Sequence, residues 1–311
     1  MNIMVLRRMT GLLPVLLTVW PLFSQQYQIG RMEAGFTDHD REDRVVKALI
    51  LYPADSAGTD VPLALRVGKG FPVIVFGHGY MMPVKYYRNI WECTVPEGFV
   101  FVLPKSASGL FPSHMEFGTD LAFILDEMIR LDGDTSSIFH GKLQSYGCLM
   151  GHSMGGGSAV LGARKTEAAR TLLVLSPLDT RPSSAEAARE LSVPSLVIAG
   201  SDDWITPPEN HQQPIYESLQ SGQKTYIMIK GATHCQMAGK YRLCNFAEKS
   251  IDLEPGIPRE KQHRILERYM LPWLKFHLYG DTASGRRFDQ QLESDTGIVF
   301  RRNGRLVDHA G

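Results

Sequence analysis

The chain has 311 residues, of which 43% are hydrophobic and 21% charged, and 33 lysines and arginines balance 33 aspartates and glutamates. This composition excludes a wholly disordered chain, because enough aliphatic side chains are present to bury a core. A formal net charge of +0 also provides no basic field that would attract nucleic acid. We therefore expect a globular protein that acts on a small or neutral substrate and has no nucleic-acid partner.

The first 24 residues have the pattern of a secretory signal peptide. Arg7 and Arg8 precede an apolar run over 9–23, and Ser24 and polar residues follow it. The run is short for a permanent membrane span and contains two prolines. We expect cleavage near Ser24, a secreted or periplasmic protein without a permanent membrane span, and one mature domain over 25–311. The alternative is an anchor that stays uncleaved.

Export would place the four cysteines of the chain in a compartment where disulfides persist. Cys235 and Cys244 lie in one short segment and are the expected pair. Cys148 lies in an apolar run that is typical of a buried strand, so we expect it to be a core thiol.

Short apolar runs alternate with helix-length segments after the signal peptide. Apolar residues at spacings of three and four predict a helix over 117–128, and further helices are expected after Ser153 and near Pro214. A closing helix is expected over 269–276, with a C-terminal extension after about 280. The pattern predicts a mostly parallel sheet with helices on both faces, whose carboxyl strand ends carry the function. Buried parallel strands are expected over 45–52, 72–76, 99–103, 146–150, 172–175, 195–199 and 225–229.

A nucleophile motif follows the fourth of these strands. It reads Gly151-His152-Ser153-Met154-Gly155, and a helix-compatible segment comes next. A serine hydroxyl is a poor nucleophile, so it has to project from a sharp turn toward a base, and the flanking glycines allow the backbone to pack closely. The sequence therefore predicts Ser153 as the nucleophile, with the N-terminus of the following helix favouring an oxyanion.

The base and the acid should come from loops after later strands, in the order acid and then histidine. His234 follows the run 225–229 and is the predicted general base. Asp202 and Asp203 follow the run 195–199, and Asp179 follows the strand before it. Adjacent residues of a turn point in different directions, so only one aspartate can reach the histidine. From the residues alone we favour Asp203, with Asp202 as the main alternative.

The loop after 72–76 reads Gly77-His78-Gly79-Tyr80 and predicts the second half of an oxyanion hole. The two expected donors are the backbone N–H groups of Tyr80 and Met154. His78 has no partner at the spacing of a metal ligand, so we interpret it as a loop-packing residue. No metal site and no cofactor are predicted.

These motifs resemble the serine esterases of the α/β-hydrolase fold. The closest resemblance is to the cutinase and poly(ethylene terephthalate) hydrolase family, within the dienelactone-hydrolase-like group. It covers about residues 28–234 and rests on the segments 151–157, 198–207, 214–216 and 231–234.

The resemblance implies an α/β-hydrolase fold with a mostly parallel central sheet and helices on both faces. It implies Asp203 rather than Asp202 as the acid. The implied triad is Ser153, Asp203 and His234, and the implied oxyanion donors are Tyr80 and Met154.

The chain departs from this family in the substrate pocket. Where the family usually has a tryptophan as an aromatic wall for the acyl group, this chain has Leu178. Trp204, beside the acid, is a candidate for a different wall, and His152 adjoins the nucleophile. We therefore expect Leu178, Trp204 and His152 to bind substrate, and we expect modest activity on aromatic polyester.

No long insertion separates the strands that end near 175 and 199, where many lipases of this fold have a cap. No large lid is predicted, and an open site suits small or polymeric esters. The leading hypothesis is a secreted, monomeric serine ester hydrolase that forms an acyl-enzyme on Ser153 and possesses polyesterase activity, for example on poly(ethylene terephthalate). The alternatives are a general short-chain carboxylesterase, an acyltransferase or peptidase on the same triad, and a catalytically silent binding module.

Overall fold

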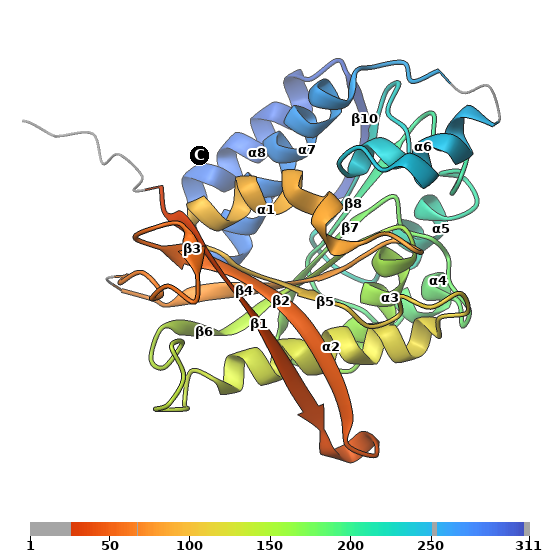
Figure 1. Cartoon of the computed structure of the whole chain (residues 1–311). Helices are drawn as coiled ribbons and strands as arrows, with labels where there is room; N and C mark the ends of the chain where they lie inside the picture. Colours follow the sequence, from red (N-terminus) through yellow and green to blue (C-terminus); the bar gives the residue numbers. More distant parts are fainter. Residues whose placement is uncertain (1–25, 67, 251–253, 308–311) are drawn as a thin grey trace, which may run out of the picture.

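The computed structural model describes residues 26–66, 68–250 and 254–307, so the predicted signal peptide lies outside the described residues. The described chain forms one ten-stranded sheet in the order β10-β9-β8-β7-β6-β4-β5-β2-β1-β3, with helices on both faces (Figure 1). No helix in the described ranges is long and apolar enough to cross a bilayer.

The centre of the sheet is parallel from β5 to β9. These strands have continuous apolar sequences because both of their faces are covered, and every residue of β4, β5 and β8 is buried. All six match predicted runs. Their bounds are β4 Phe71–Gly77, β5 Val100–Pro104, β6 Leu143–His152, β7 Ala169–Leu175, β8 Ser195–Gly200 and β9 Lys224–Ile229.

The predicted run 45–52 is a strand, but the expectation that it is parallel was wrong. It forms β2 (Arg44–Ala54), which pairs antiparallel with β5 and with β1 (Gln28–Asp38). Its first residues alternate between exposed and buried positions, as expected where one face of an antiparallel strand meets solvent. A two-residue strand, β3 (Gly58–Thr59), completes this edge.

The segment after 280 is part of the sheet rather than an appended tail. It forms α8 (Thr282–Ser294) and β10 (Ile298–Asn303), and β10 pairs antiparallel with β9 at the opposite edge. The expected closing helix precedes it as α7 (Arg259–Leu274), followed by a π-helical segment, Lys275–Tyr279.

Each face of the sheet has its own hydrophobic core. On one face the buried side chains come from α2, α3, α4 and α5, and on the other from α1, α7 and α8. The helix α2 begins after Ser113, whose hydroxyl accepts the N–H of Glu116, and it buries the apolar face that its spacing predicts. The remaining bounds are α1 Arg88–Thr94, α2 His114–Arg130, α3 Met154–Ala163, α4 Ser184–Ala188, α5 Gln212–Ser218 and α6 Arg242–Lys249.

The expected disulfide between Cys235 and Cys244 is confirmed, with 5.6 Å between the two Cα atoms. Cys148 is fully buried in β6 and Cys93 is half-buried in α1, and both are free thiols. Burial raises the pKa of both thiols, so neither supplies the reactive thiolate at neutral pH.

We therefore expect the native protein to be inert toward thiol reagents. At pH 8, Ellman's reagent should detect no thiol in the native protein. After denaturation it should detect the two free thiols, and after denaturation with reduction all four cysteines. A thiol that reacts fast in the native state would contradict the burial of Cys93 or Cys148.

Candidate active site

Ser153 lies in the sharp turn between β6 and α3. Its backbone has φ 56° and ψ −124°, a conformation that is strained for a residue with a side chain. Such strain is typical of a nucleophile elbow, because the turn lifts the serine hydroxyl above the carboxyl ends of the strands. The N–H of Ser153 donates to the carbonyl of Leu175 at 3.0 Å, which ties the turn to the neighbouring strand β7.

The two glycines of the motif are required by close backbone packing. A Cβ on Gly151 would lie 2.3 Å from the carbonyl oxygen of Gly155, and a Cβ on Gly155 would lie 2.1 Å from that of Gly77. These distances are far below van der Waals contact. The elbow therefore packs directly on its own helix and on the end of β4, which brings Ser153 next to the loop that carries Tyr80.

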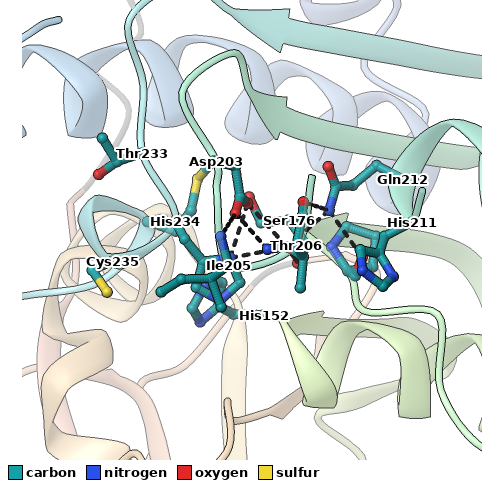
Figure 2. A network of polar contacts seen from close by, with 12 residues as sticks. His152, Ser176, Asp203, Ile205, Thr206, His211, Gln212, Thr233, His234 and Cys235 are labelled. Atoms are coloured by element: carbon teal, nitrogen blue, oxygen red, sulfur yellow. Dashed lines mark hydrogen bonds and ion pairs between the residues drawn. The ribbon is translucent and has the colours of Figure 1, made fainter. Parts of the chain in front are cut away.

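His234 and Asp203 form a buried pair at the ends of β9 and β8. His234 Nδ1 lies 2.9 Å from Asp203 Oδ2, and the two side chains are almost fully buried (Figure 2). The ring of His234 lies 4.6 Å from that of His152, the residue before the nucleophile. Ser153 makes no hydrogen bond to His234 within the described residues. Bonds of this kind are often long before a substrate binds.

The environment of Asp203 favours its ionised form. Burial alone would raise its pKa, but the charge and the hydrogen bond of His234, together with the N–H of Thr206, outweigh burial and lower the pKa. The carboxylate accepts the N–H groups of Ile205 at 3.1 Å and Thr206 at 2.8 Å. It is therefore held as an acceptor for His234 Nδ1–H, which leaves Nε2 free to accept a proton.

The other two aspartates that the sequence analysis considered do not contact His234. Asp202 is half-buried and accepts the hydroxyl of Ser201 at 2.7 Å. Asp179 accepts the N–H of Ala185 at 3.0 Å and so binds the first turn of α4. Of the three candidates, the structure brings Asp203 alone to the histidine.

Sequence reasoning missed two buried residues behind this pair, Thr206 and Gln212. The hydroxyl of Thr206 lies 3.0 Å from both Asp203 Oδ2 and His234 Nδ1. The amide of Gln212 donates to the carbonyls of Thr206 at 2.8 Å and Pro177 at 3.1 Å (Figure 2). These bonds join the acid loop to the loop after β7. The motif at 198–207 includes Thr206, but no local pattern indicates Gln212.

The two expected oxyanion donors come from the start of α3 and from the loop after β4. Met154 is the first residue of α3, so its N–H has no partner within the helix. Tyr80 follows β4, and its hydroxyl donates to the carbonyl of Leu110 at 2.8 Å. Neither backbone N–H has an acceptor among the described residues.

The three candidate substrate-binding residues have different environments. Leu178 is half-buried, and its N–H donates to the carbonyl of Ser153 at 3.0 Å, so it directly adjoins the nucleophile. Trp204 is 66% exposed beside Asp203. The side chain of His152 is fully buried, which leaves it no surface for a substrate in this structure.

Several exposed apolar side chains lie on loops that belong to the site or contact it. They belong to the oxyanion loop, to the loop that Tyr80 contacts and to the acid loop, and no cap helix covers them between β7 and β8 apart from the five-residue α4. The side chains are Tyr80, Met81, Leu110, Phe111, Trp204 and Ile205. We call these six residues the apolar rim. Exposed apolar side chains that lie together can form a binding surface for an apolar ligand.

Comparison with known proteins gives one family and several relatives. Residues 73–290 match a family model described as PET hydrolase-like. The chain is 31% identical to Cutinase 2 of Thermobifida cellulosilytica over 233 residues, which is 74% of this chain and 78% of the relative. It is also 31% identical to Cutinase cut1 of Thermobifida fusca, of which it covers 64%. Bis(hydroxyethyl) terephthalate hydrolase of Streptomyces coelicolor is 33% identical over 118 residues, or 38% of this chain and 36% of the relative.

Proposed function

The chain belongs to the PET hydrolase-like family, and from this premise we propose that it is a secreted serine hydrolase that cleaves carboxylic esters through an acyl-enzyme on Ser153. One observation carries the proposal. Ser153 occupies a strained elbow at the end of β6 and follows His152, whose ring lies 4.6 Å from that of a buried His234 that Asp203 holds at 2.9 Å. These are the nucleophile, base and orienting acid of the serine-hydrolase mechanism.

In the proposed acylation step, Ser153 Oγ attacks the ester carbonyl carbon while its proton passes to His234 Nε2. The carbonyl oxygen becomes an oxyanion, which accepts hydrogen bonds from the N–H groups of Tyr80 and Met154. Asp203 stabilises the imidazolium and keeps the ring oriented. The intermediate collapses when His234 returns the proton to the leaving alkoxide, and the alcohol departs.

Deacylation repeats these roles with water. His234 Nε2 takes a proton from the water, whose oxygen attacks the acyl carbon, and the same two N–H groups bind the second oxyanion. Collapse expels Ser153 Oγ, which regains its proton from His234. The products are a carboxylic acid and a free enzyme, so no cofactor is consumed.

We propose that the substrates include bulky or polymeric esters. The apolar rim supports this class, because an insoluble ester chain must lie across an open, apolar surface to bring one bond to Ser153. The printed names of the relatives, cutinases and a bis(hydroxyethyl) terephthalate hydrolase, point to the same chemistry. Export also belongs to the proposal, since the disulfide between Cys235 and Cys244 suits an oxidising compartment.

Three assays test the proposed function. A fluorophosphonate probe should label the purified protein at Ser153, and the protein should hydrolyse a p-nitrophenyl ester but not the matched p-nitroanilide. Release of soluble acid from polyester film then measures polymer activity. Absence of both labelling and hydrolysis would indicate a silent binding module, and comparable hydrolysis of the anilide would indicate a peptidase.

Substitution of Leu178 is expected to change polymer activity selectively. An aromatic contact adds about 0.5–1.5 kcal/mol beyond the burial of apolar area, which corresponds to at most about tenfold in rate. Leu178→Trp or Leu178→Phe should therefore raise kcat/KM on aromatic polyester by up to about tenfold. Small aliphatic esters should be little affected, because they do not reach a stacking surface.

The matched control for this prediction is Glu186→Phe, which adds a ring at an exposed position of α4 outside the loop of Leu178, and kcat/KM is measured on both substrates. Equal changes on polyester and small ester in the Leu178 variants would show that the residue does not form the acyl wall. In that case Trp204 becomes the candidate, and Trp204→Ala should reduce polyester hydrolysis.

A further inference from the structure

The hydroxyl of Tyr87 joins the oxyanion loop to the nucleophile elbow. Tyr87 is fully buried at the end of a 3₁₀ turn, Val84–Tyr87, that leads into α1. Its Oη accepts the N–H of Gly79 at 2.7 Å and lies 3.0 Å from His152 Nδ1. Gly79 immediately precedes Tyr80, and His152 immediately precedes Ser153, so one hydroxyl contacts the neighbours of both groups.

We propose that Tyr87 is a positioning residue that fixes the backbone N–H of Tyr80 in the oxyanion hole relative to Ser153. This inference rests on the proposed ester hydrolase function. It assigns Tyr87 no contact with the substrate, because the side chain is buried behind the loop.

The geometry of the Gly79–Tyr80 peptide explains how this positioning works. The carbonyl of Gly79 accepts the N–H of Met82 at 3.0 Å and lies 2.9 Å from His78 Nδ1. In a planar trans peptide the N–H of Tyr80 points away from the carbonyl of Gly79. Bonds on the carbonyl set the plane of this peptide, and the bond from Gly79 N–H to Tyr87 fixes the chain on its other side. Together these bonds restrict the Tyr80 N–H to a single orientation.

Burial keeps both side chains of this network uncharged. Burial raises the pKa of Tyr87, so its hydroxyl keeps its single proton, and one lone pair accepts Gly79 N–H. Burial and the nearby His234 hold the pKa of His152 well below its ordinary value, so the ring is neutral. A neutral ring can either accept the Tyr87 hydroxyl at Nδ1 or donate its Nδ1–H to Tyr87 Oη, and both arrangements keep the two side chains hydrogen-bonded. The sulfur of Met82, at 3.4 Å from Oη, is the weaker acceptor.

The network therefore connects three segments that are far apart in the sequence. It links the loop after β4, the turn before α1 and the end of β6 through one buried oxygen. The relative position of the two oxyanion donors, Tyr80 N–H on the loop and Met154 N–H on the elbow, depends on this link. Loss of the Tyr87 hydroxyl oxygen should increase the mobility of the loop after β4. It should leave no large cavity in the core, because the ring of Tyr87 still packs on Phe76.

Tyr87→Phe tests the proposal, because it removes the oxygen and keeps the ring. Removal of a whole oxyanion donor lowers kcat by about 10²–10³. A donor that stays but loses its fixed orientation should cost less, so we expect kcat on a p-nitrophenyl ester to fall by about 10- to 100-fold with KM within about twofold. The affinity for a trifluoromethyl ketone, whose adduct with Ser153 carries an oxyanion, should fall by the same factor as kcat.

Tyr269→Phe is the matched control. Tyr269 is also fully buried, and its hydroxyl bonds to Asp295 Oδ2 at 2.9 Å, but it lies on α7 outside the proposed machinery. Both variants lose one buried hydroxyl, so comparable shifts in melting temperature are expected. The control should retain wild-type kcat and inhibitor affinity.

Four results discriminate between the possibilities. A fall in kcat and in inhibitor affinity that is confined to Tyr87→Phe supports the inference. Unchanged kcat in Tyr87→Phe overturns it, and so does an equal loss in both tyrosine variants, which would indicate a general effect of stability. A wild-type protein that neither hydrolyses esters nor reacts with the fluorophosphonate would refute the proposed function itself, and this inference with it.

Discussion

Ser153→Ala is expected to lower kcat for ester hydrolysis by a factor on the order of 10⁴ to 10⁶. The hydroxyl oxygen forms the covalent bond to the acyl group, and no other nucleophile occupies the turn between β6 and α3. The fold should survive, because alanine removes a single oxygen that makes no hydrogen bond to His234. Kinetics on a soluble aryl ester, with circular dichroism and thermal melting, measure both effects.

His234→Ala should lose activity to a similar extent, and the double variant should be no worse than either single one. Residues that act as a unit in one step are strongly non-additive in their effects on kcat. Additive losses from Ser153→Ala and His234→Ala would show that the two side chains act in separate steps.

Ser158→Ala provides a matched control for the nucleophile. Ser158 is fully buried in α3, five residues after Ser153, and its hydroxyl has no hydrogen-bond partner in the described part of the chain. Its replacement should leave kcat unchanged. A Ser153→Ala protein that folds normally and retains wild-type activity would exclude the serine mechanism.

The parallel centre of the sheet was predictable because burial on both faces leaves a continuous apolar signal. The sequence analysis did not predict β1 and β10, because these two strands lack a continuous apolar signal. The sequence of β1 mixes glycine and charged residues with apolar ones, and its pairing with β2 over eleven residues determines its structure. In β10, Arg302 is stabilised by Asp289 and Glu293 of α8, a contact that no local pattern reveals.

The site likewise contains some residues that the sequence predicts and others that it does not. The positions of Ser153, Asp203 and His234 follow from chain order, because each comes directly after a parallel strand and such strand ends meet at one edge of the sheet. The residues that hold them were not predictable in this way. Tyr87 and His152 are 65 residues apart in the sequence, so their contact depends on the packing of α1 against the sheet.

The segment between His234 and α7 was also not predicted to have structure. It contains α6, and the disulfide joins α6 to Cys235, the residue after the proposed base. The sequence indicated the cysteine pair, but it gave no sign that Glu248 accepts the N–H of Cys235 at 2.8 Å. A disulfide pair can thus be inferred from the spacing of two cysteines, whereas the hydrogen bonds around it become apparent only in the folded structure.

Asp203→Asn should lower kcat by roughly 10⁴ and leave KM nearly unchanged, whereas Asp202→Asn should change kcat by less than about threefold. The carboxylate of Asp203 accepts His234 Nδ1–H and so keeps Nε2 free to take the proton of Ser153. An asparagine amide can present its N–H₂ group to Nδ1 instead, which stabilises the tautomer with the proton on Nε2 and blocks the base.

Asp202→Asn is a close control for Asp203→Asn, because both residues are aspartates of the same loop. Asp202 accepts the hydroxyl of Ser201 and does not contact His234, so its amide variant tests the loss of a carboxylate from the same turn without changing the base. The inactivity of Asp203→Asn should also ease at high pH, where hydroxide can replace general base catalysis by the histidine. If Asp202→Asn were the variant that lost activity, the acid would act through a different arrangement of this loop, and the 2.9 Å contact between Asp203 and His234 would have no catalytic role.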